Sequence, residues 1–387
     1  MSISNPSHPP PPRSSPRPSD AIQPRRCDGR KILVVAGCLV ALFLWGTLRE
    51  RGAGAPRATT LDLHGLALGT TWRVSIANAQ GRAADLAAAR MAVETALAEV
   101  ERQMSVFHPA SEISQFNAAP ADTPIEISEG FAQVVRFALD LAERSGGAFD
   151  PTVAPLVELW GFGPHPRPSR PPSDDEVAAA REAVGFERIV WEGPRRLAKR
   201  HPQTRLDLNA VAKGYAVDRV AVALEELGLR HFFVEVGGEI VTRGRRPGGG
   251  PWRIGVDRPV PGAPPGADLQ RVLRLNDAAV ATSGDYRNIL HDETAGGSWT
   301  HLFDPRDGRP VRRMAGSVTV VADTCLKADG LATTLFVMGP DDGLPWLARH
   351  FPEAEALFVL RAPDGTFAER TSSGFVQAIQ GEESLRK

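Results

Sequence analysis

The amino-acid sequence predicts an α+β fold, with mixed or antiparallel sheets and packed helices in one compact unit of two lobes. Residues 61–77 alternate apolar and polar side chains around Gly69-Thr70-Thr71, which indicates two strands that meet at a bend. Residues 83–103 instead repeat apolar side chains at helical spacing. Further strand-like and helix-like runs follow without an internal repeat, and this mixture favours the α+β class.

The remaining elements follow in order along the chain. Helices are predicted from Ser128 to Ser145, over residues 174–184, after Lys213, after Lys327 and over residues 341–350. Strands are predicted at residues 189–191, 232–236, 252–256, 272–275, 317–321 and 356–360. Residues 164–173, rich in proline and arginine, are expected to form a loop.

Composition and charge exclude some classes of protein. With 387 residues, 42% of them hydrophobic and 24% charged, the chain has room for one large or two medium domains. The formal net charge is −1 and no long basic run is present, so we expect no nucleic-acid partner. Cys27, Cys38 and Cys325 are too widely separated for a disulfide framework or a CxxC metal site. Cys325 is expected to be a small buried residue, although a redox role stays open.

The N-terminal region is predicted to lie outside the fold. Residues 1–31 form a disordered tail rich in proline and arginine, and residues 32–48 form an uncharged apolar run at the short end of a membrane span. Basic residues precede this run, so the positive-inside rule places the tail in the cytoplasm. The rest of the chain then lies on the periplasmic side, anchored to the inner membrane. Residues 49–60 are a linker, residues 61–375 the folded domain and residues 376–387 a C-terminal tail.

Two other interpretations of this region stay open. Val35-Ala36-Gly37-Cys38 resembles a lipoprotein cleavage box, but the apolar run continues past the cysteine. A cleaved secretory signal needs small residues after its apolar region, and none is well placed beyond Trp45-Gly46. In all three cases the folded domain is exported from the cytoplasm.

The segment Leu206–Arg219 (L-D-L-N-A-V-A-K-G-Y-A-V-D-R) places Asp207, Lys213 and Gly214 at the expected start of a helix. A lysine at the positive end of the helix dipole is mildly unfavourable, and a glycine inside a helix costs about 1 kcal/mol relative to alanine. A sequence that accepts both costs indicates a bound anion such as a phosphate. The alternative is a lysine stem packed over an apolar surface, with Asp207 as an ordinary helix cap.

Two further segments carry aromatic rings, glycines and acids. In Gly146–Phe162, the backbone of Asp150 is restricted by the proline that follows it. Phe149, Trp160 and Phe162 offer flat apolar surfaces for a ring system, unless they are ordinary core aromatics. Phe233–Glu239 ends a strand in two glycines, which either let the backbone approach a ligand or form a simple turn.

Hydroxyl groups and a histidine mark the next candidates. Ala281–Tyr286 (A-T-S-G-D-Y) contains Thr282 and Ser283, whose hydroxyl and backbone groups are suited to phosphate oxygens. His301 precedes a rigid Asp-Pro turn and is either a general base, a hydrogen-bond donor or a structural histidine.

A possible metal site lies in Ala328–Thr334 (A-D-G-L-A-T-T). Asp329 and Thr333 are four residues apart, so on a helix their oxygen atoms share one face. A carboxylate and a hydroxyl are hard ligands of the kind that Mg²⁺ prefers. The alternative is a capping aspartate with a threonine bonded back to a carbonyl. Asp307 and Asp323 are expected to be surface carboxylates.

Together these segments fit a large phosphate-bearing ligand with an aromatic ring system, held with Mg²⁺. Over about residues 61–375 the chain resembles the ApbE-type flavin transferases, the FAD:protein FMN transferase family. The resemblance rests on eight ordered motifs: L-G-T-T-W, M-S-V-F-H-P-A-S-E-I-S-Q-F-N, G-G-A-F-D-P-T-V-A-P-L, L-D-L-N-A-V-A-K-G-Y-A-V-D-R, V-G-G-E, A-T-S-G-D-Y-R, F-D-P-R-D-G-R-P and A-D-G-L-A-T-T.

The resemblance implies an ApbE-like, T-fold-related domain and a set of site residues. Members of this family bind FAD with Mg²⁺ and transfer its FMN part to a Thr or Ser of a target protein, releasing AMP. By resemblance, the Mg²⁺ ligands are the Ala210 carbonyl, Asp329 and Thr333, and His301 assists the acceptor hydroxyl. The base that takes the hydroxyl proton is then His301 or a metal-bound carboxylate such as Asp329. The flavin contacts are Leu68, Phe107, Ala148, Phe149, Asp150, Asp207, Lys213 and Phe303.

The chain departs from the family pattern at two positions. Leu68 stands where the family usually has methionine, which keeps the apolar contact without the thioether. Ala332 stands where some members have an acid, so the metal shell is expected to hold one ligand fewer. The acceptor implied is an exported, membrane-associated redox protein. Two alternatives stay open: an FAD pyrophosphatase that uses water as the acceptor, and a non-catalytic flavin-binding protein.

Overall fold

The N-terminal strands of the domain form one edge of the main sheet. The computed structural model describes residues 60–77, 83–164, 170–287, 289–291, 298–311, 315–362 and 364–379. Strands β1 (Thr60–Ala67) and β2 (Thr70–Ala77) pair antiparallel. Leu68 and Gly69 make the turn between them with φ values of 53° and 70°, the left-handed conformation that tight hairpin turns use.

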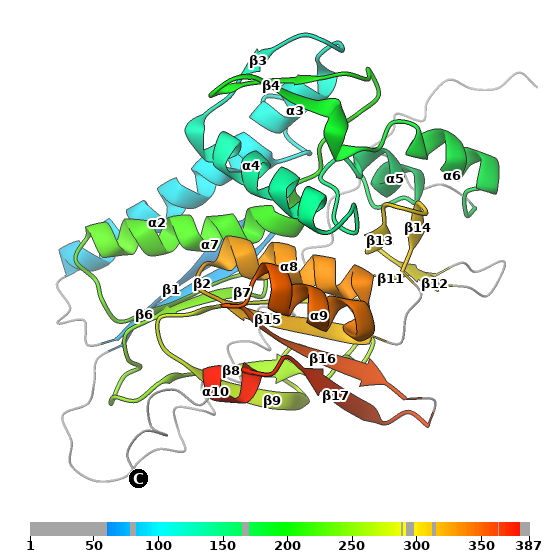
Figure 1. Ribbon diagram of the computed structural model, residues 1–387. Helices are drawn as coiled ribbons and strands as arrows, with labels where there is room; N and C mark the ends of the chain where they lie inside the picture. The colour runs from blue at the N-terminus through cyan, green and yellow to red at the C-terminus, as the bar shows by residue number, and fades with distance from the viewer. Residues whose placement is uncertain are drawn as a thin grey trace, which may run out of the picture. The chain divides into compact units, whose positions relative to one another are not determined.

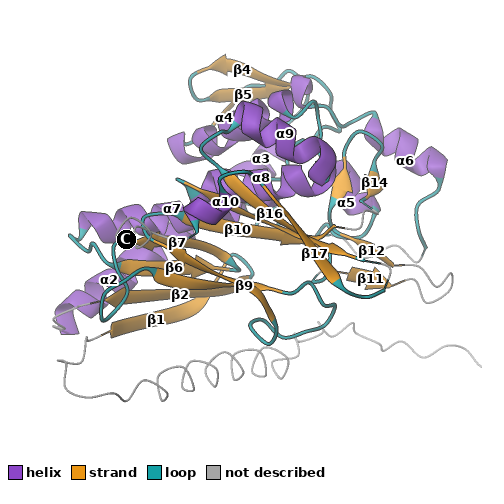
Figure 2. Ribbon diagram, turned by 60° about the horizontal axis from the view of Figure 1, so that its bottom comes forward, coloured by secondary structure: helices purple, strands orange, loops and turns teal. Residues whose placement is uncertain are grey.

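The main sheet contains eight strands in the order β1-β2-β6-β7-β10-β15-β16-β17, and every strand pair in it is antiparallel (Figures 1 and 2). Strand β10 lies near the centre, between β7 and β15. The further strands are β6 (Phe232–Val236), β7 (Glu239–Arg243), β10 (Ala279–Gly284), β15 (Ala315–Ala322), β16 (Glu355–Arg361) and β17 (Phe367–Thr371).

Four helices cover one face of this sheet (Figure 1). They are α2 (Ala83–Met104), α7 (Asn209–Glu226), α8 (Cys325–Met338) and α9 (Pro340–His350). The main hydrophobic core lies between these helices and the sheet, and Ala279 and Ala281 of β10 belong to it. Because α8 packs directly over β10, small side chains on that face of the strand allow a close approach.

The opposite face of the sheet is covered by a hairpin of β8 (Trp252–Asp257) and β9 (Leu269–Leu275), together with the short helix α10 (Phe375–Ala378). Val280 of β10 points into this second core, between its neighbours Ala279 and Ala281 in the first. Strand β10 is therefore buried on both faces, as the period-two alternation of a strand requires.

A smaller group of elements lies beyond the helical layer (Figure 1). Helix α4 (Glu129–Arg144) packs against α7 and α8, and its N-cap Ser128 accepts a hydrogen bond from the backbone of Phe131. Near it lie α3 (Glu112–Ala118) and a sheet in the order β3 (Ile125–Glu126), β5 (Arg196–Lys199), β4 (Ile189–Gly193). The remaining elements are α5 (Ala154–Leu159), α6 (Asp174–Arg181), the 3-10 turn Phe186–Arg188, and the short strands β11 (Ile289–His291), β12 (Ser298–Thr300), β13 (Phe303–Asp304) and β14 (Arg309–Pro310).

The α+β class with antiparallel sheets is confirmed, as are the predicted strands and the helices at residues 83–103, 174–184 and 341–350 and after Ser128. Two helices begin earlier than expected: α7 at Asn209 and α8 at Cys325. The strands β7, β10 and β17 and the helices α3 and α5 were not predicted. The fold continues past residue 375, because Phe375 and Ile379 belong to the second core.

The predicted cytoplasmic tail, the membrane segment and nearly all of the linker fall in residues 1–59, outside the described residues. Within the ranges that the structure does describe, no helix has both the length and the apolar character needed to cross a bilayer. The membrane segment stays a prediction.

Candidate functional site

A cavity of about 700 Å³ opens where the helical layer, strand β10 and the loops around β13 meet. Its walls come from segments that lie far apart in the sequence: the β1–β2 turn, the end of α2, the turn after α4, the start of α7, β10 and α8. The residues predicted to be catalytic, to bind the cofactor or to bind the metal all line it: Leu68, Phe107, Ala148, Phe149, Asp150, Asp207, Ala210, Lys213, Thr282, Ser283, His301, Phe303, Asp329 and Thr333. The structure brings them together, and their individual roles stay predictions.

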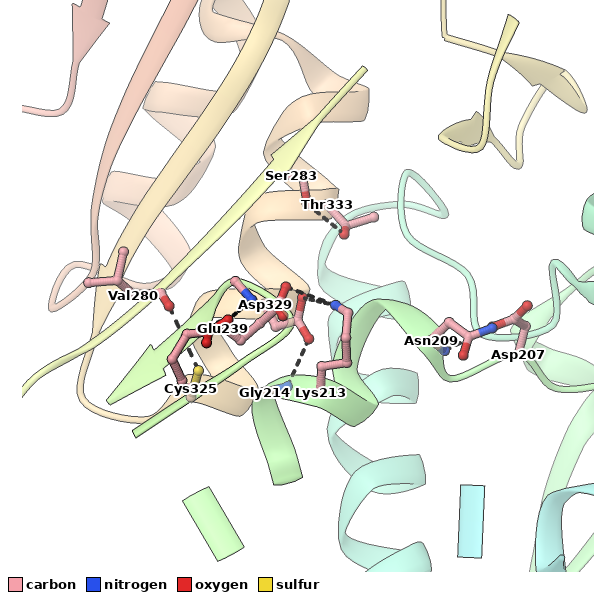
Figure 3. Close-up of polar contacts among 12 residues, drawn as sticks. Asp207, Asn209, Lys213, Gly214, Glu239, Val280, Ser283, Cys325, Asp329 and Thr333 are labelled. Atoms are coloured by element: carbon pink, nitrogen blue, oxygen red, sulfur yellow. Dashed lines mark hydrogen bonds and ion pairs between the residues drawn. The ribbon is translucent and has the colours of Figure 1, made fainter. Parts of the chain in front are cut away.

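The floor of the cavity is the crossing of α7 and α8. Gly214 sits at this crossing, where an added Cβ would lie 2.3 Å from the Cys325 carbonyl oxygen and 2.8 Å from the Asp329 Cβ. Only glycine permits this approach, since real Cβ atoms do not come so close to backbone. The backbone N–H of Gly214 donates to Asp329 Oδ2 at 2.9 Å (Figure 3).

These contacts correct the interpretation of Lys213 and Gly214 made from sequence. The glycine is explained by helix packing. Lys213 lies in the second turn of α7, and its ammonium is 2.8 Å from Glu239 Oε1 and 4.0 Å from Asp329 Oδ1 (Figure 3). The anions beside this lysine are therefore carboxylates of the protein itself. Burial alone would lower the Lys213 pKa, but Asp329 and Glu239 raise it above its ordinary value, so the ammonium stays charged.

Asp329 and Thr333 lie one turn apart on α8, as their spacing predicted. Asp329 is 3% exposed, and burial raises its pKa to about 7 against the opposing effect of Lys213. The Thr333 hydroxyl lies 3.1 Å from the Ser283 hydroxyl of β10 (Figure 3). Ala332 is fully buried in the main core and adds no acidic side chain beside Asp329.

Asp218, one turn after Gly214 on α7, fixes the start of α8. Its carboxylate accepts hydrogen bonds from the backbone N–H groups of Cys325 at 2.8 Å and Leu326 at 2.9 Å. A carboxylate at this position satisfies first-turn amides of α8 and complements the helix dipole. Asp218 and Gly214 together set how α8, and with it Asp329, sits against α7.

We expect Asp218→Ala to lower the free energy of unfolding by about 1–3 kcal/mol, because it leaves two partly buried amides without their acceptor. The position of Asp329 should shift with it, since Asp329 lies one turn further along α8. Chemical denaturation measures the first effect. Asp323→Ala is the matched control, because Asp323 also accepts from a backbone N–H at the start of α8 and pairs with Lys327, but it does so at the exposed surface. Its removal should therefore cost less, about 1 kcal/mol or below. Equal stability of the two variants would refute the role given to Asp218.

The carboxylate of Asp150 accepts three hydrogen bonds from within the protein. Asp150 is 7% exposed, and its Oδ1 accepts from the Thr152 backbone N–H at 2.7 Å and the Thr152 hydroxyl at 2.6 Å. Its Oδ2 accepts from the Phe186 backbone at 3.0 Å, and burial raises its pKa to about 6. These bonds fix the turn between α4 and α5. If Asp150 also contacts a ligand, its carboxylate must accept a fourth hydrogen bond.

Asp207 lies just before α7 and hydrogen-bonds to its first turn. Its Oδ1 accepts from the backbone N–H of Asn209, the first residue of the helix, at 2.8 Å. The N-cap position itself is Leu208 rather than Asp207 or Asn209. Asp207 therefore accepts a hydrogen bond from the first turn of α7, as a capping residue would, but it does so from the position before the N-cap.

Aromatic side chains form one wall of the cavity. The ring of Phe162 lies 5.8 Å from that of Phe303 in an edge-to-face arrangement and 6.2 Å from that of His301 in a tilted one. Phe107 stands at the mouth, 68% exposed. Trp160 does not line the cavity. It is buried behind Phe303, and its indole N–H donates to the Gly308 carbonyl at 2.9 Å.

Several residues that line the cavity were not predicted from the sequence. Glu239 ends the V-G-G-E motif, but it lies 26 residues from Lys213 in the sequence, so no local signal indicated their ion pair. Gly237, with a φ of 64°, brings that turn close to the Lys213 stem: an added Cβ would lie 3.3 Å from Lys213 Cδ. Glu101 also lines the cavity, and so do Tyr286 and Arg287 of the A-T-S-G-D-Y-R motif, to which the sequence assigned no role.

The chain is similar to known proteins over most of its length. The model of the ApbE family matches residues 68–358. The FAD:protein FMN transferase of Vibrio cholerae serotype O1 is 38% identical, covering 82% of this chain and 92% of that protein. The FAD:protein FMN transferase of Haemophilus influenzae is 35% identical, covering 84% of this chain and 92% of that one.

Among solved structures, the flavin transferase ApbE from Vibrio cholerae superimposes with a TM-score of 0.75 at 37% identity. The match covers 83% of this chain and 99% of that chain. The antiparallel sheets and covering helices described above are thus the architecture of that enzyme. The chain therefore belongs to the ApbE family of FAD:protein FMN transferases.

Proposed function

We propose that the cavity binds FAD together with Mg²⁺ and transfers the FMN part to a Thr or Ser hydroxyl of an acceptor protein, with release of AMP. The observation that carries the proposal is the joint placement of Asp329, Thr333 and the start of α7 at one end of a cavity whose other wall is aromatic. The relatives named above are FAD:protein FMN transferases, and the cavity has oxygen atoms for phosphates and rings for a flavin.

The residues present fit a magnesium ion. Asp329 offers a carboxylate and Thr333 a hydroxyl from the same face of α8. In a regular helix the Gly214 N–H would pair with the Ala210 carbonyl, but here it also serves Asp329 Oδ2 at 2.9 Å. The Ala210 oxygen therefore keeps capacity for a cation. All three are hard oxygen ligands, which Mg²⁺ prefers.

The charged side chains that line the cavity also favour a bound cation. Among the described residues, the lining of the cavity contains five carboxylates and two cations, Lys213 and Arg287. The carboxylates are Glu101, Asp150, Asp207, Glu239 and Asp329. Within the described residues, Glu239 Oε2 is buried and has no hydrogen-bond donor. A pyrophosphate would meet repulsion in such a site unless a further cation accompanied it.

In the proposed reaction the acceptor hydroxyl oxygen bonds to the phosphorus on the FMN side, and the bond from that phosphorus to the bridging oxygen breaks as AMP leaves. Bound Mg²⁺ would offset the charge on the pyrophosphate and on the departing AMP. Of the chain's own residues, His301, which lies on the aromatic wall, would take the hydroxyl proton. Lys213 keeps the Glu239 and Asp329 carboxylates together.

The aromatic wall would hold the flavin ring. Phe303 and Phe149 are nearly buried in the wall, whereas Phe107 is largely exposed. A flat ring system bound against these side chains would bury apolar surface. Ser283 presents its hydroxyl from β10 to Thr333, on the side of the proposed metal ligands. The Thr282 hydroxyl lies on the other face of the strand, where it pairs with Thr319, so only the backbone of Thr282 is available to the ligand.

An assay with and without acceptor tests the proposal and its main alternative. The purified protein is incubated with FAD and Mg²⁺, alone and with a candidate exported redox subunit. Fluorescent flavin that stays on the subunit in a denaturing gel supports transfer. Steady production of FMN and AMP without acceptor, at a rate that acceptor does not change, would support a pyrophosphatase. Binding of FAD with neither product would support a non-catalytic flavin-binding protein.

We expect His301→Ala to slow transfer about 100-fold, because the acceptor hydroxyl loses its base, while FAD affinity stays within about twofold. Single-turnover flavinylation and flavin fluorescence titration measure the two quantities separately. His64→Ala is the control, since His64 is exposed on β1 and does not line the cavity. Equal transfer rates for the two variants would exclude His301 as the base.

For the cell, we propose that residues 32–48 anchor the protein in the inner membrane, with the domain and its acceptor on the periplasmic side. The basic flank of this segment supports that orientation. Protease treatment of spheroplasts tests it: the domain should be digested in intact spheroplasts. Protection until the membrane is lysed would overturn the proposal.

A further inference from the structure

The cavity contains one cation whose charge the mechanism above does not use. Of the two basic side chains that line it, Lys213 is held between Glu239 and Asp329. Its positive charge is therefore largely balanced by the protein before any ligand arrives. The other is Arg287, the last residue of the A-T-S-G-D-Y-R motif, which continues from Ser283 beside Thr333.

The backbone that carries Arg287 is firmly held. Asp285 forms a two-pronged ion pair with Arg361, at 2.6 and 2.7 Å. Tyr286 is 7% exposed and packs against Gly284, where an added Cβ would lie 2.5 Å from the ring. The two residues before Arg287 are thus anchored to the sheet, which directs the arginine to one part of the cavity wall.

The guanidinium itself is only partly engaged. Its Nη2 donates to Asp257 Oδ2 at 2.6 Å, and its central carbon lies 5.2 Å from the centre of the Tyr286 ring. A guanidinium has five N–H donors in a planar fork, so this ion pair leaves donors for a second anion. The side chain is 49% exposed, so a ligand in the cavity reaches it without a large rearrangement.

We propose that Arg287 binds a phosphate group of the dinucleotide and so selects phosphorylated flavins over riboflavin. The inference rests on the proposed function, because it takes FAD to be the ligand of this cavity. A phosphate oxygen accepts from the free side of the guanidinium while Asp257 holds the other side in place. Arg287 then provides fixed positive charge at the wall formed by the Ser283–Arg287 segment, in a cavity whose own charged groups are mostly acidic.

A series of flavins tests this assignment. Riboflavin, FMN and FAD carry no phosphate, one phosphate and a pyrophosphate on the same ring. Their dissociation constants are measured by flavin fluorescence in Mg²⁺, within seconds of mixing, for the wild type and Arg287→Gln. We expect Arg287→Gln to weaken FAD binding about tenfold and riboflavin binding less than twofold.

Asp257→Asn is the matched variant, because it removes the same ion pair but leaves the guanidinium in the wall. It should keep FAD affinity within about threefold of the wild type. An equal loss for FAD and riboflavin in Arg287→Gln would overturn the proposal, and so would unchanged FAD affinity or an equal loss in Asp257→Asn. If the wild type itself did not bind FAD, the proposed function would fail; normal wild-type binding with an unaffected Arg287→Gln would refute only the role of Arg287.

Discussion

Asp329→Ala is expected to abolish FMN transfer, with a loss of at least about 1000-fold. Asp329 is nearly buried, lies on the same face of α8 as Thr333 and supplies the only carboxylate of the proposed magnesium shell. Without it, the ion loses its charged ligand and the pyrophosphate loses the cation that offsets its charge. Removal of one stabilising group from a preorganised site typically costs 100- to 1000-fold, and loss of the ion adds to that.

Two readouts separate this effect from a folding defect. Covalent flavin on the acceptor, seen by fluorescence in a denaturing gel, reports transfer, and Mg²⁺-dependent thermal stabilisation reports metal binding. Asp329→Asn is the matched variant, because its amide oxygen still accepts from the Gly214 N–H while the charge is gone. We expect both variants to lose transfer and the Mg²⁺ effect. Full flavinylation by Asp329→Ala would remove Asp329 from the metal site.

Gly214→Ala is expected to destabilise the protein and inactivate it together. The new methyl group would lie 2.3 Å from a backbone carbonyl oxygen of α8, a contact that no side-chain rotation relieves. Helices α7 and α8 must therefore move apart, at about 3 kcal/mol or more, which corresponds to a fall in melting temperature of roughly 5 °C or more. The same movement would break the Gly214–Asp329 hydrogen bond and separate the Ala210 carbonyl from Asp329.

Gly343→Ala provides the control for this substitution. Gly343 is also a buried helical glycine, but its added Cβ would meet Leu335 Cδ2 at 3.0 Å, the far end of a flexible side chain. Since alanine favours a helix by about 1 kcal/mol over glycine, the two effects should nearly cancel. Calorimetry and the flavinylation assay measure both variants. A Gly214→Ala protein with normal melting temperature and activity would contradict the packing argument.

Much of the fold was predictable because its elements carry strong periodicity. Residues 83–103 repeat apolar side chains on one face, and Val93, Leu97 and Val100 are buried as expected. Strand β10 escaped prediction for a physical reason. Its residues A-V-A-T-S-G are small because α8 lies directly over them, and a run of small residues with a glycine resembles a turn when its neighbours are unknown.

Prediction of the candidate site is limited in the same way, by contacts between segments that are distant in the sequence. The motifs identified which segments take part, and the fold does gather all of them at one cavity. The partners of individual side chains depend on contacts across more than 25 residues of sequence. Glu239 pairs with Lys213 from a neighbouring strand, and Gly214 makes room for a carbonyl of α8. No local pattern around Lys213 or Gly214 encodes those partners.

Crystals of the domain grown with FAD and Mn²⁺ in place of Mg²⁺ provide the most direct test of the central claim. The anomalous scattering of manganese locates the ion independently of activity. We predict a single strong peak bounded by the Asp329 carboxylate, the Thr333 hydroxyl and the Ala210 carbonyl, next to the pyrophosphate of FAD. A peak elsewhere in the cavity, or FAD bound in full with no peak at these three oxygens, would contradict the account.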